Sequence, residues 1–210
     1  MASTLEMRLW IVAIACIGLV LSLGALVAHR PPSSIDVAAG SLRGHAVPLA
    51  LFFTGLGRWP VLLGLSVVAA GAAIVLRTGF TAVAIVYAAQ VLSQGANAGV
   101  KLLFARARPD AWLHIHETDL SYPSGHAVTA VVFFVGFAIL AWHAPLPRPI
   151  AGTIAAALLV CAVGVAWSRL ALAAHYFTDV LAGTLFGTAF LCAAIALILR
   201  YVSIRAVSAG

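Results

Sequence analysis

Three short stretches of this chain hold most of the side chains that can do chemistry. The first places Lys101 and Arg108 seven residues apart before a proline, and the second is the tetrapeptide 123–126, Pro-Ser-Gly-His. The third, residues 168–179, contains an arginine, a histidine and an aspartate. Only 9% of the 210 residues are charged, so these stretches concentrate charge that is scarce elsewhere. Cations, histidines, a hydroxyl and a carboxylate together suit holding and cleaving a phosphate.

Lys101 and Arg108 are spaced close to two helical turns, so in a helix that continues to residue 108 they project in similar directions. Pro109 would then end the helix, because the residue before a proline avoids the helical conformation. A guanidinium offers a planar fork of donors to phosphate oxygens, and an ammonium offers a mobile point charge. The alternative is that both side chains only anchor a helix end at a membrane interface.

Residues 123–126 precede an apolar run, which predicts a helix that begins here. Ser124 or Gly125 can cap this helix, and the amides of its first turn together with the helix dipole form an anion site. His126 would face the same anion and could protonate a leaving oxygen near neutral pH. The alternative is an ordinary serine cap beside an unrelated histidine.

His175 and Asp179 are four residues apart, so on one helix they share a face and a ring N–H can reach the carboxylate. A carboxylate that fixes the tautomer of a histidine leaves the other ring nitrogen available as a base or nucleophile. Asp179 also lies inside an apolar segment, where an ionisable group is costly. Arg169 supplies a further phosphate donor. The alternative is a buried pair that only locks two helices together.

The rest of the chain has the composition of an integral membrane protein. Hydrophobic residues make up 63% of it and the mean hydropathy is +1.10, well above the values of soluble domains. The length favours a single domain, residues 1–210, and its apolar runs of about 20 residues match a bilayer core. We predict an all-α fold, a bundle of six transmembrane helices near 9–28, 59–76, 80–100, 126–142, 150–167 and 176–199.

The polar segments between these helices predict which face carries the motifs. Residues 77–79 and 143–149 contain helix breakers and charge and are predicted to be short connections. Three longer polar stretches would lie together on the opposite face: 29–58, 101–125 and 168–175. Residues 48–56 are apolar but too short to span, which favours a re-entrant or interfacial segment. A secretory signal is an alternative for residues 1–28, but the apolar run is too long and lacks a clean cleavage site.

The positions of lysine and arginine predict the orientation. With Lys101, Arg108 and Arg169 set aside as phosphate ligands, five arginines remain on the face of the termini and four on the other, and the five lie in shorter loops. Both termini are therefore predicted to be cytoplasmic, in a bacterial inner membrane, with the motifs facing the periplasm or the outside. The pI of 9.9 does not indicate a nucleic-acid partner, because cations scattered among membrane spans form no basic stripe.

The loop before the second motif allows one competing interpretation. It contains four residues of the types that bind zinc or calcium: His114, His116, Glu117 and Asp119. The cluster has no second pair at a metal-like spacing, so a solvated loop is favoured. Four side chains are instead candidates to border a substrate headgroup: Asp110, Glu117, Asp119 and Tyr122. The three cysteines lie inside spans without paired spacing and are predicted to be small apolar fillers.

The motifs Lys-x6-Arg-Pro, Pro-Ser-Gly-His and Ser-Arg-x5-His-x3-Asp, in order over residues 101–179, resemble the three-part signature of the type 2 phosphatidic acid phosphatase superfamily. The resemblance implies that His175 is a nucleophile that becomes a phosphohistidine, that Asp179 orients it, and that His126 is the general acid. It also implies five ligands of the phosphoryl oxygens: Lys101, Arg108, Ser124, Gly125 and Arg169. By the same resemblance no metal or other cofactor is required.

The function implied is hydrolysis of the terminal phosphate of a membrane lipid phosphate or lipid diphosphate. An anion or lipid transporter that uses the same cations is the alternative, although transport would not require His175, His126 and Asp179 together. Vanadate-dependent haloperoxidases share the motifs but are soluble, which the predicted spans exclude. Undecaprenyl diphosphate, phosphatidylglycerol phosphate, phosphatidate and a lipid A phosphate carry similar terminal groups. The substrate therefore stays open, with a carrier diphosphate favoured by analogy alone.

Overall fold

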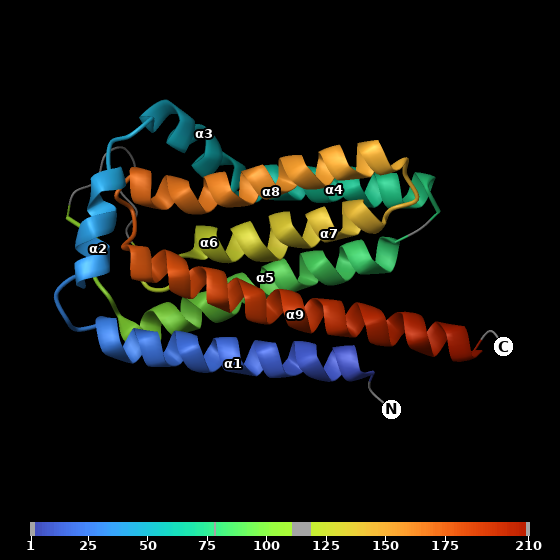
Figure 1. Ribbon diagram of the computed structural model, residues 1–210, viewed down its shortest axis with the longest axis horizontal. Helices are drawn as coiled ribbons and strands as arrows, with labels where there is room; N and C mark the ends of the chain where they lie inside the picture. Colours follow the sequence, from blue (N-terminus) through green and yellow to red (C-terminus); the bar gives the residue numbers. More distant parts are fainter. Residues whose placement is uncertain (1–2, 78, 111–118, 209–210) are drawn as a thin grey trace.

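The computed structural model describes residues 3–77, 79–110 and 119–208, with side chains described as far as residue 204. Within these ranges the regular structure is helical and contains no strand. Helices cover all six ranges predicted to span: α1 (Thr4–Val27), α4 (Trp59–Val75), α5 (Phe80–Phe104), α6 through α7 (Gly125–His143), α8 (Arg148–Ala171) and α9 (Phe177–Ser208). Figure 1 shows them lying lengthwise beside one another, with the start of α1 and the end of α9 at the same end. The all-α fold class is confirmed.

The number of membrane spans is less clear-cut than the number of helices. Among the described residues, four helices are long and apolar enough to cross a membrane alone: α1, Gly125–His143, α8 and Phe177–Ile204. α4 qualifies only together with α3 (Val47–Leu56), from which it is bent by 56°. α5 is not among them, because polar residues interrupt its apolar sequence. The count of six spans is therefore not fully confirmed, whereas the short apolar segment at 48–56 does form a separate helix.

The local sequence explains where several helices begin. The Ser3 hydroxyl accepts the Glu6 N–H at 3.2 Å while the Glu6 carboxylate accepts the Ser3 N–H at 3.0 Å, which is a reciprocal cap at the start of α1. Prolines stand in the first turn of α3, α4 and α8, where the missing N–H costs no helical hydrogen bond.

The end of α5 differs from the prediction. The helix stops at Phe104 because Ala105 adopts a left-handed conformation with φ of 46°. Residues 105–109 are not helical, so Arg108 does not extend from the helix that carries Lys101, and Pro109 is not the residue that ends it. The two cations instead reach the same region from a helix and from an extended segment. The left-handed turn redirects the chain toward the start of α9.

Two glycines let α9 pass very close to α6 (Gly125–Thr129). A Cβ added at Gly183 would collide with the Ser124 carbonyl oxygen, and one added at Gly187 would lie 2.9 Å from the Val128 carbonyl oxygen. Small residues four apart allow membrane helices to approach to backbone contact. At this crossing the Ser124 N–H donates to the Asp179 carbonyl at 3.0 Å. The glycines thereby bring the second and third motifs together.

The surface and the ends of the molecule fit a membrane setting. Large apolar side chains are exposed on the outer helices, for example Ile14 and Val163 at 71% each, as expected for a lipid-facing surface. A short helix, α2 (Ser34–Ala39), crosses the end opposite the termini and contacts α9. Figure 1 shows that the α1–α2–α3 connections and the start of α9 share this end. The described residues of the long polar stretches lie toward this end of the molecule, as predicted.

Candidate active site

His175 and Asp179 lie close together at the start of α9, although they are not on one helix as predicted. His175 lies in the turn before the helix and Asp179 in its first turn, and both are buried. The His175 Nδ1 is 3.5 Å from the Asp179 Oδ2. On the other side of the ring, the Arg108 Nη1 lies 3.0 Å from the His175 Nε2. An arginine N–H can only donate, so Nε2 is the accepting nitrogen and the ring proton belongs on Nδ1, which faces the carboxylate.

The Asp179 carboxylate is held by more than its histidine. Its Oδ2 accepts the Ser121 hydroxyl at 2.5 Å and the Tyr176 backbone N–H at 2.9 Å. Its Oδ1 accepts the Arg106 guanidinium at 2.6 Å. Both oxygens are therefore fixed by short contacts, and the carboxylate has little freedom to turn away from the ring.

Arg106 extends this arrangement to a second carboxylate, on α2. Its Nη2 is 3.1 Å from the Asp36 Oδ2, its Nη1 donates to the Thr178 hydroxyl at 2.7 Å, and its guanidinium lies 4.3 Å from the centre of the Tyr176 ring. Asp36 also accepts the Thr178 N–H at 2.9 Å. Burial raises the pKa of Asp36, but hydrogen bonds from Thr178, Ser33 and Arg106 outweigh it, so its pKa lies below the ordinary value.

We refer to the side chains of Asp36, Arg106, Ser121 and Asp179 as the carboxylate network. The sequence motifs predict no role in the site for Asp36, Arg106 or Ser121. Asp36 lies 143 positions before Asp179, so no local spacing could connect them. The sequence offered one general indication of this network. In a membrane protein with few charges, an arginine that becomes buried requires carboxylate partners.

Lys101 and Arg108 converge on one carboxylate at the mouth of the site. The Lys101 Nζ lies 2.8 Å from the Asp119 Oδ2 and also donates to the Leu120 carbonyl. The Arg108 Nε donates to the Asp119 carbonyl at 2.8 Å, and its Nη2 pairs with the Asp119 carboxylate. Burial raises the pKa of Asp119, but the charges and hydrogen bonds of both cations outweigh it and hold that pKa below its ordinary value.

The second motif begins a helix as predicted. Ser124 is the N-cap of α6, and its buried hydroxyl has no hydrogen-bond partner among the described residues. His126 is in the first turn, and its Nε2 is likewise buried and without a partner in the described part of the chain. Two buried polar atoms at a helix start fit a site that binds a ligand, because such atoms are otherwise satisfied inside the protein.

Arg169 occupies a different position from the one its motif predicted. α8 continues to Ala171, so Arg169 belongs to the last helical turn and not to a loop. It is 1% exposed, and its Nη1 donates to the Thr54 hydroxyl of α3 at 2.5 Å. Arg169 does not line the cavity between α5, α6 and the bend that joins α3 to α4. Its role as a phosphate ligand stays a prediction.

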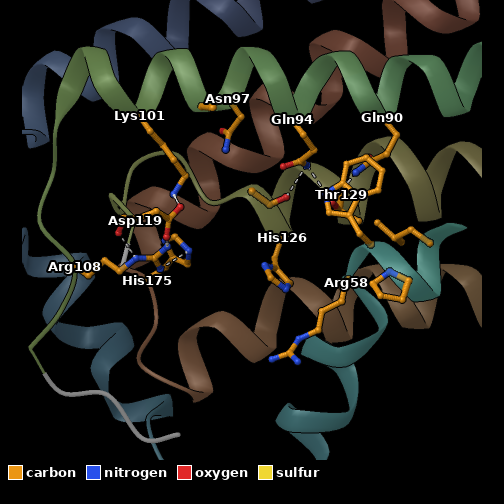
Figure 2. Close-up of a pocket in the computed structure, with 16 residues that line it drawn as sticks. Arg58, Gln90, Gln94, Asn97, Lys101, Arg108, Asp119, His126, Thr129 and His175 are labelled. Carbon is orange, nitrogen blue, oxygen red and sulfur yellow. Dashed lines mark hydrogen bonds and ion pairs between the residues drawn. The ribbon is translucent and has the colours of Figure 1, made fainter. Parts of the chain in front are cut away.

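This cavity has a volume of about 580 Å³. Five of the eight predicted site residues line it: Lys101, Arg108, Gly125, His126 and His175. Ser124, Asp179 and Arg169 are not part of its lining. The other polar lining residues are Arg58, Gln90, Gln94, Asn97, Asp119 and Thr129. Figure 2 shows Gln90, Gln94, Asn97 and Lys101 projecting from α5 toward the side of His126, with Arg58 on the other side of His126.

Only some of the side chains predicted to border a substrate headgroup lie at the cavity. Asp119 lines the cavity, whereas Tyr122 is fully buried and its hydroxyl donates to the Val20 carbonyl of α1 at 2.5 Å. Burial raises the pKa of Tyr122, so the phenol stays protonated. The competing metal interpretation, which the sequence did not favour, concerns residues 114–119, of which 114–118 lie outside the described residues. Among the described residues no group of three His, Cys, Asp or Glu side chains is arranged around a common point.

Comparisons with known proteins identify the family of this chain. The family model of the PAP2 superfamily matches residues 61–202, which include all three motifs. A lipid A 1-phosphatase of Rhizobium johnstonii is 34% identical over 104 residues, 43% of this chain and 37% of the relative. The putative undecaprenyl-diphosphatase YbjG of Escherichia coli K12 is 41% identical over 76 residues, 36% of this chain and 33% of the relative. The aligned region thus spans about a third of either relative.

One solved structure matches the fold over most of its length. It is the crystal structure of a transmembrane PAP2 type phosphatidylglycerolphosphate phosphatase from Bacillus subtilis, with a TM-score of 0.75 and 23% sequence identity. The match covers 90% of this chain and 96% of that one. At this identity the likeness shows a shared fold.

Proposed function

This chain belongs to the PAP2 superfamily, and on that premise we propose that it hydrolyses the terminal phosphate of a membrane lipid phosphate or diphosphate through a phosphohistidine. The two relatives described above are named as lipid phosphatases. The observation that carries the proposal is the setting of His175. Its Nδ1 lies 3.5 Å from a fixed carboxylate, its Nε2 lies 3.0 Å from the Arg108 guanidinium, and the residue lines the cavity. This is the arrangement that a nucleophilic imidazole requires.

In the first step the His175 Nε2 attacks phosphorus and the bond from phosphorus to the leaving oxygen breaks. Arg108 releases Nε2 as its guanidinium binds a phosphoryl oxygen, and Lys101 and the amides at the start of α6 bind the others. The ring becomes positively charged as the N–P bond forms, and Asp179 stabilises that charge across the 3.5 Å to Nδ1. His126 gives a proton to the leaving oxygen, so the lipid alcohol or lipid phosphate departs in a stable form.

In the second step water attacks the phosphohistidine. His126, now without its proton, accepts one from the water as the P–N bond breaks, which releases inorganic phosphate and restores both histidines. The positive field comes from Lys101, Arg108 and the helix start, with Arg169 as a further proposed ligand. We therefore propose that turnover requires no metal ion.

The test is phosphate release by the purified protein from a panel of four substrates: undecaprenyl diphosphate, phosphatidylglycerol phosphate, phosphatidate and a lipid A phosphate. We expect turnover of at least one, undiminished by excess chelator and abolished in His175→Asn. The matched control is His29→Asn, which changes an exposed histidine. Absence of turnover on the whole panel, or activity that a chelator removes and a divalent ion restores, would contradict the proposal.

We also propose that the site faces the outside and that the termini are cytoplasmic. In a variant without native cysteines, an impermeant thiol reagent added to intact cells should label Arg43→Cys, in the exposed connection after α2, and should not label Pro145→Cys, between α7 and α8. Labelling of the second position alone would invert the orientation.

A further inference from the structure

The bend between α3 and α4 lies against His126, the proposed general acid. Figure 2 shows Arg58, which follows Gly57 in this bend, on the side of His126 away from α5. The bend precedes residue 61, where the match to the family model begins, and none of the three sequence motifs includes it. A part played by the bend in the reaction would therefore be one that the motifs do not predict.

Gly57 leaves the space that the His126 ring occupies. A Cβ added at Gly57 would lie 2.7 Å from the His126 Cδ2 and 3.3 Å from its Nε2. It would also lie 3.3 Å from the Val165 Cγ1 on α8, so no free space remains beside the ring. Gly57 has a φ of −79°, which residues with a side chain also adopt, so the glycine serves the contact and not the backbone conformation. Gly55, two residues earlier, has nothing within 4 Å of the corresponding position.

Thr54, three residues before Gly57, connects the bend to two site residues. It is 2% exposed, and its hydroxyl accepts the Arg169 Nη1 at 2.5 Å. The Thr54 backbone forms a hydrogen bond with the His126 ring. Because the His126 Nε2 has no partner among the described residues, its Nδ1 makes this bond. One residue of α3 therefore holds both the proposed acid and Arg169.

α3 is itself fixed on α8, which gives the bend a firm base. A Cβ added at Gly164 of α8 would collide with the Phe53 ring. Ala50 is fully buried and packs with Ala171 and Leu172 at the end of α8. Close packing of this kind resists displacement, so α8 sets the position of the bend.

The position of the His126 ring matters because an acid must lie within hydrogen-bonding distance of the oxygen that it protonates. The Nε2 is buried, so the access of a leaving oxygen to this nitrogen depends on where the ring and the bend lie. A misplacement of about 1 Å can slow a reaction step about 10²-fold. The bend can therefore change the rate without touching the substrate.

We propose that Gly57 and Thr54 are positioning residues for His126: Gly57 leaves the space for the ring, and Thr54 holds the ring at its Nδ1. This inference rests on the proposed phosphatase function and adds how its acid is placed. The effect of both residues should appear in the step in which His126 gives its proton to the leaving oxygen. A direct role in phosphate binding, or a role in packing alone, would instead affect every substrate alike.

The test compares kcat of the purified protein on an alkyl lipid phosphate and on para-nitrophenyl phosphate, whose leaving group needs little protonation. The alkyl substrate is phosphatidate or phosphatidylglycerol phosphate, whichever the wild type hydrolyses faster. Gly57→Ala should lower kcat on the alkyl substrate by about 10- to 100-fold and on the aryl substrate by no more than about twofold. The matched control is Gly55→Ala, which adds the same methyl group two residues away in open space and should match the wild type on both substrates.

Variants of Thr54 test the second positioning residue. The Thr54 hydroxyl anchors α3 to Arg169 of α8; Thr54→Val removes this hydroxyl and keeps the shape, whereas Thr54→Ser keeps the hydroxyl. We expect Thr54→Val to lower the ratio of alkyl to aryl turnover about threefold and Thr54→Ser to restore it. A loss that comes from phosphate binding by Arg169 falls on both substrates and cancels in this ratio.

In a His126→Ala background, Gly57→Ala should cause no further loss, because both changes act on one interaction. All variants should elute and unfold as the wild type does; if Gly57→Ala does not, the ratio measured for Thr54→Val decides. Equal losses on the alkyl and aryl substrates, or no loss on either, would overturn the positioning role while phosphatase activity stood. A wild type inactive on both kinds of substrate would overturn the proposed function, and the inference with it.

Discussion

The polar groups behind His175 and those on the far wall of the cavity are bonded in different ways. In the carboxylate network, both oxygens of Asp179 have partners within 3 Å, and Arg106 connects them to Asp36 on α2. On the cavity side, three lining residues each have a buried polar atom without a partner among the described residues: Gln90 Oε1, Asn97 Oδ1 and His126 Nε2. The first set is complete within the protein, whereas the second leaves hydrogen-bonding groups unused among the described residues. We infer that the first positions the nucleophile and the second binds the group that the nucleophile attacks.

This difference predicts that variants of the network act on kcat and stability, whereas variants of the cavity wall act according to the substrate. The largest effect is expected for Asp179→Asn, which keeps the shape and removes the charge that supports the imidazolium. We expect kcat to fall by about 10⁴-fold with little change in KM. Single-turnover kinetics in detergent separate the two quantities, and a loss confined to KM would show that Asp179 only shapes the site.

Arg106→Gln tests whether the network holds the fold together as well as the histidine. Removal of one member of a buried charge cluster leaves carboxylates unpaired, at a cost of about 3–5 kcal/mol. We expect a lower unfolding temperature together with reduced kcat. In the double variant with Asp36→Asn the two losses should be less than additive, because the residues share one interaction. Additive losses would separate Asp36 from the network.

His126→Ala tests the cavity side. If His126 protonates the leaving oxygen, kcat on an alkyl lipid phosphate should fall by about 10²-fold or more. The loss on an aryl phosphate should be much smaller, since its leaving group is already a stable anion. Similar losses on both substrates would indicate that His126 binds the phosphate.

Asp119→Asn should have the smallest effect, and in the opposite direction. Asp119 pairs with Lys101 and Arg108, the cations proposed to bind phosphate, so its carboxylate competes with the substrate. Because 57% of its side chain is exposed, we expect KM to fall only about two- to fivefold.

The pH dependence of that effect follows from the lowered pKa of Asp119. The pairing is complete above the ordinary carboxyl pKa of about 3.9 and is lost only as the pH falls through the lowered value. The ratio of wild-type to variant KM should therefore be constant between about pH 5 and pH 8. A ratio that changes across this range would contradict the assignment.

Local chemistry made much of the molecule predictable. The helices follow from apolar runs, and the short spacing of His175 and Asp179 brings them close together, although only Asp179 lies on the helix. The end of α5 at Ala105 was not predictable, because a left-handed alanine has no local signature and depends on tertiary contacts. The next residue, Arg106, turns there toward two carboxylates, on α2 and α9. Such contacts depend on how helices pack, which in this chain includes the close approach allowed by Gly183.

The same reason explains the misjudged position of Arg169. The sequence ends its helix before Ser168, whereas in the structure α8 continues to Ala171 and Arg169 reaches Thr54 on α3. The polar face of α5 was also overlooked. Gln90, Gln94 and Asn97 are at helical spacing from Lys101 and lie on the same side of the helix. Because apolar residues surround them in the sequence, they were interpreted only as polar interruptions of a membrane span. Only the structure shows that the three residues line one cavity.

The most direct test of the account is to identify the covalent intermediate. Wild-type protein should be mixed with a substrate labelled in its terminal phosphate, quenched within one turnover and digested. We expect acid-labile, alkali-stable label on the peptide that contains His175, and none on the same peptide of His175→Asn. Turnover with no trapped label at any quench time, or label on another residue, would contradict the claim that His175 is the nucleophile.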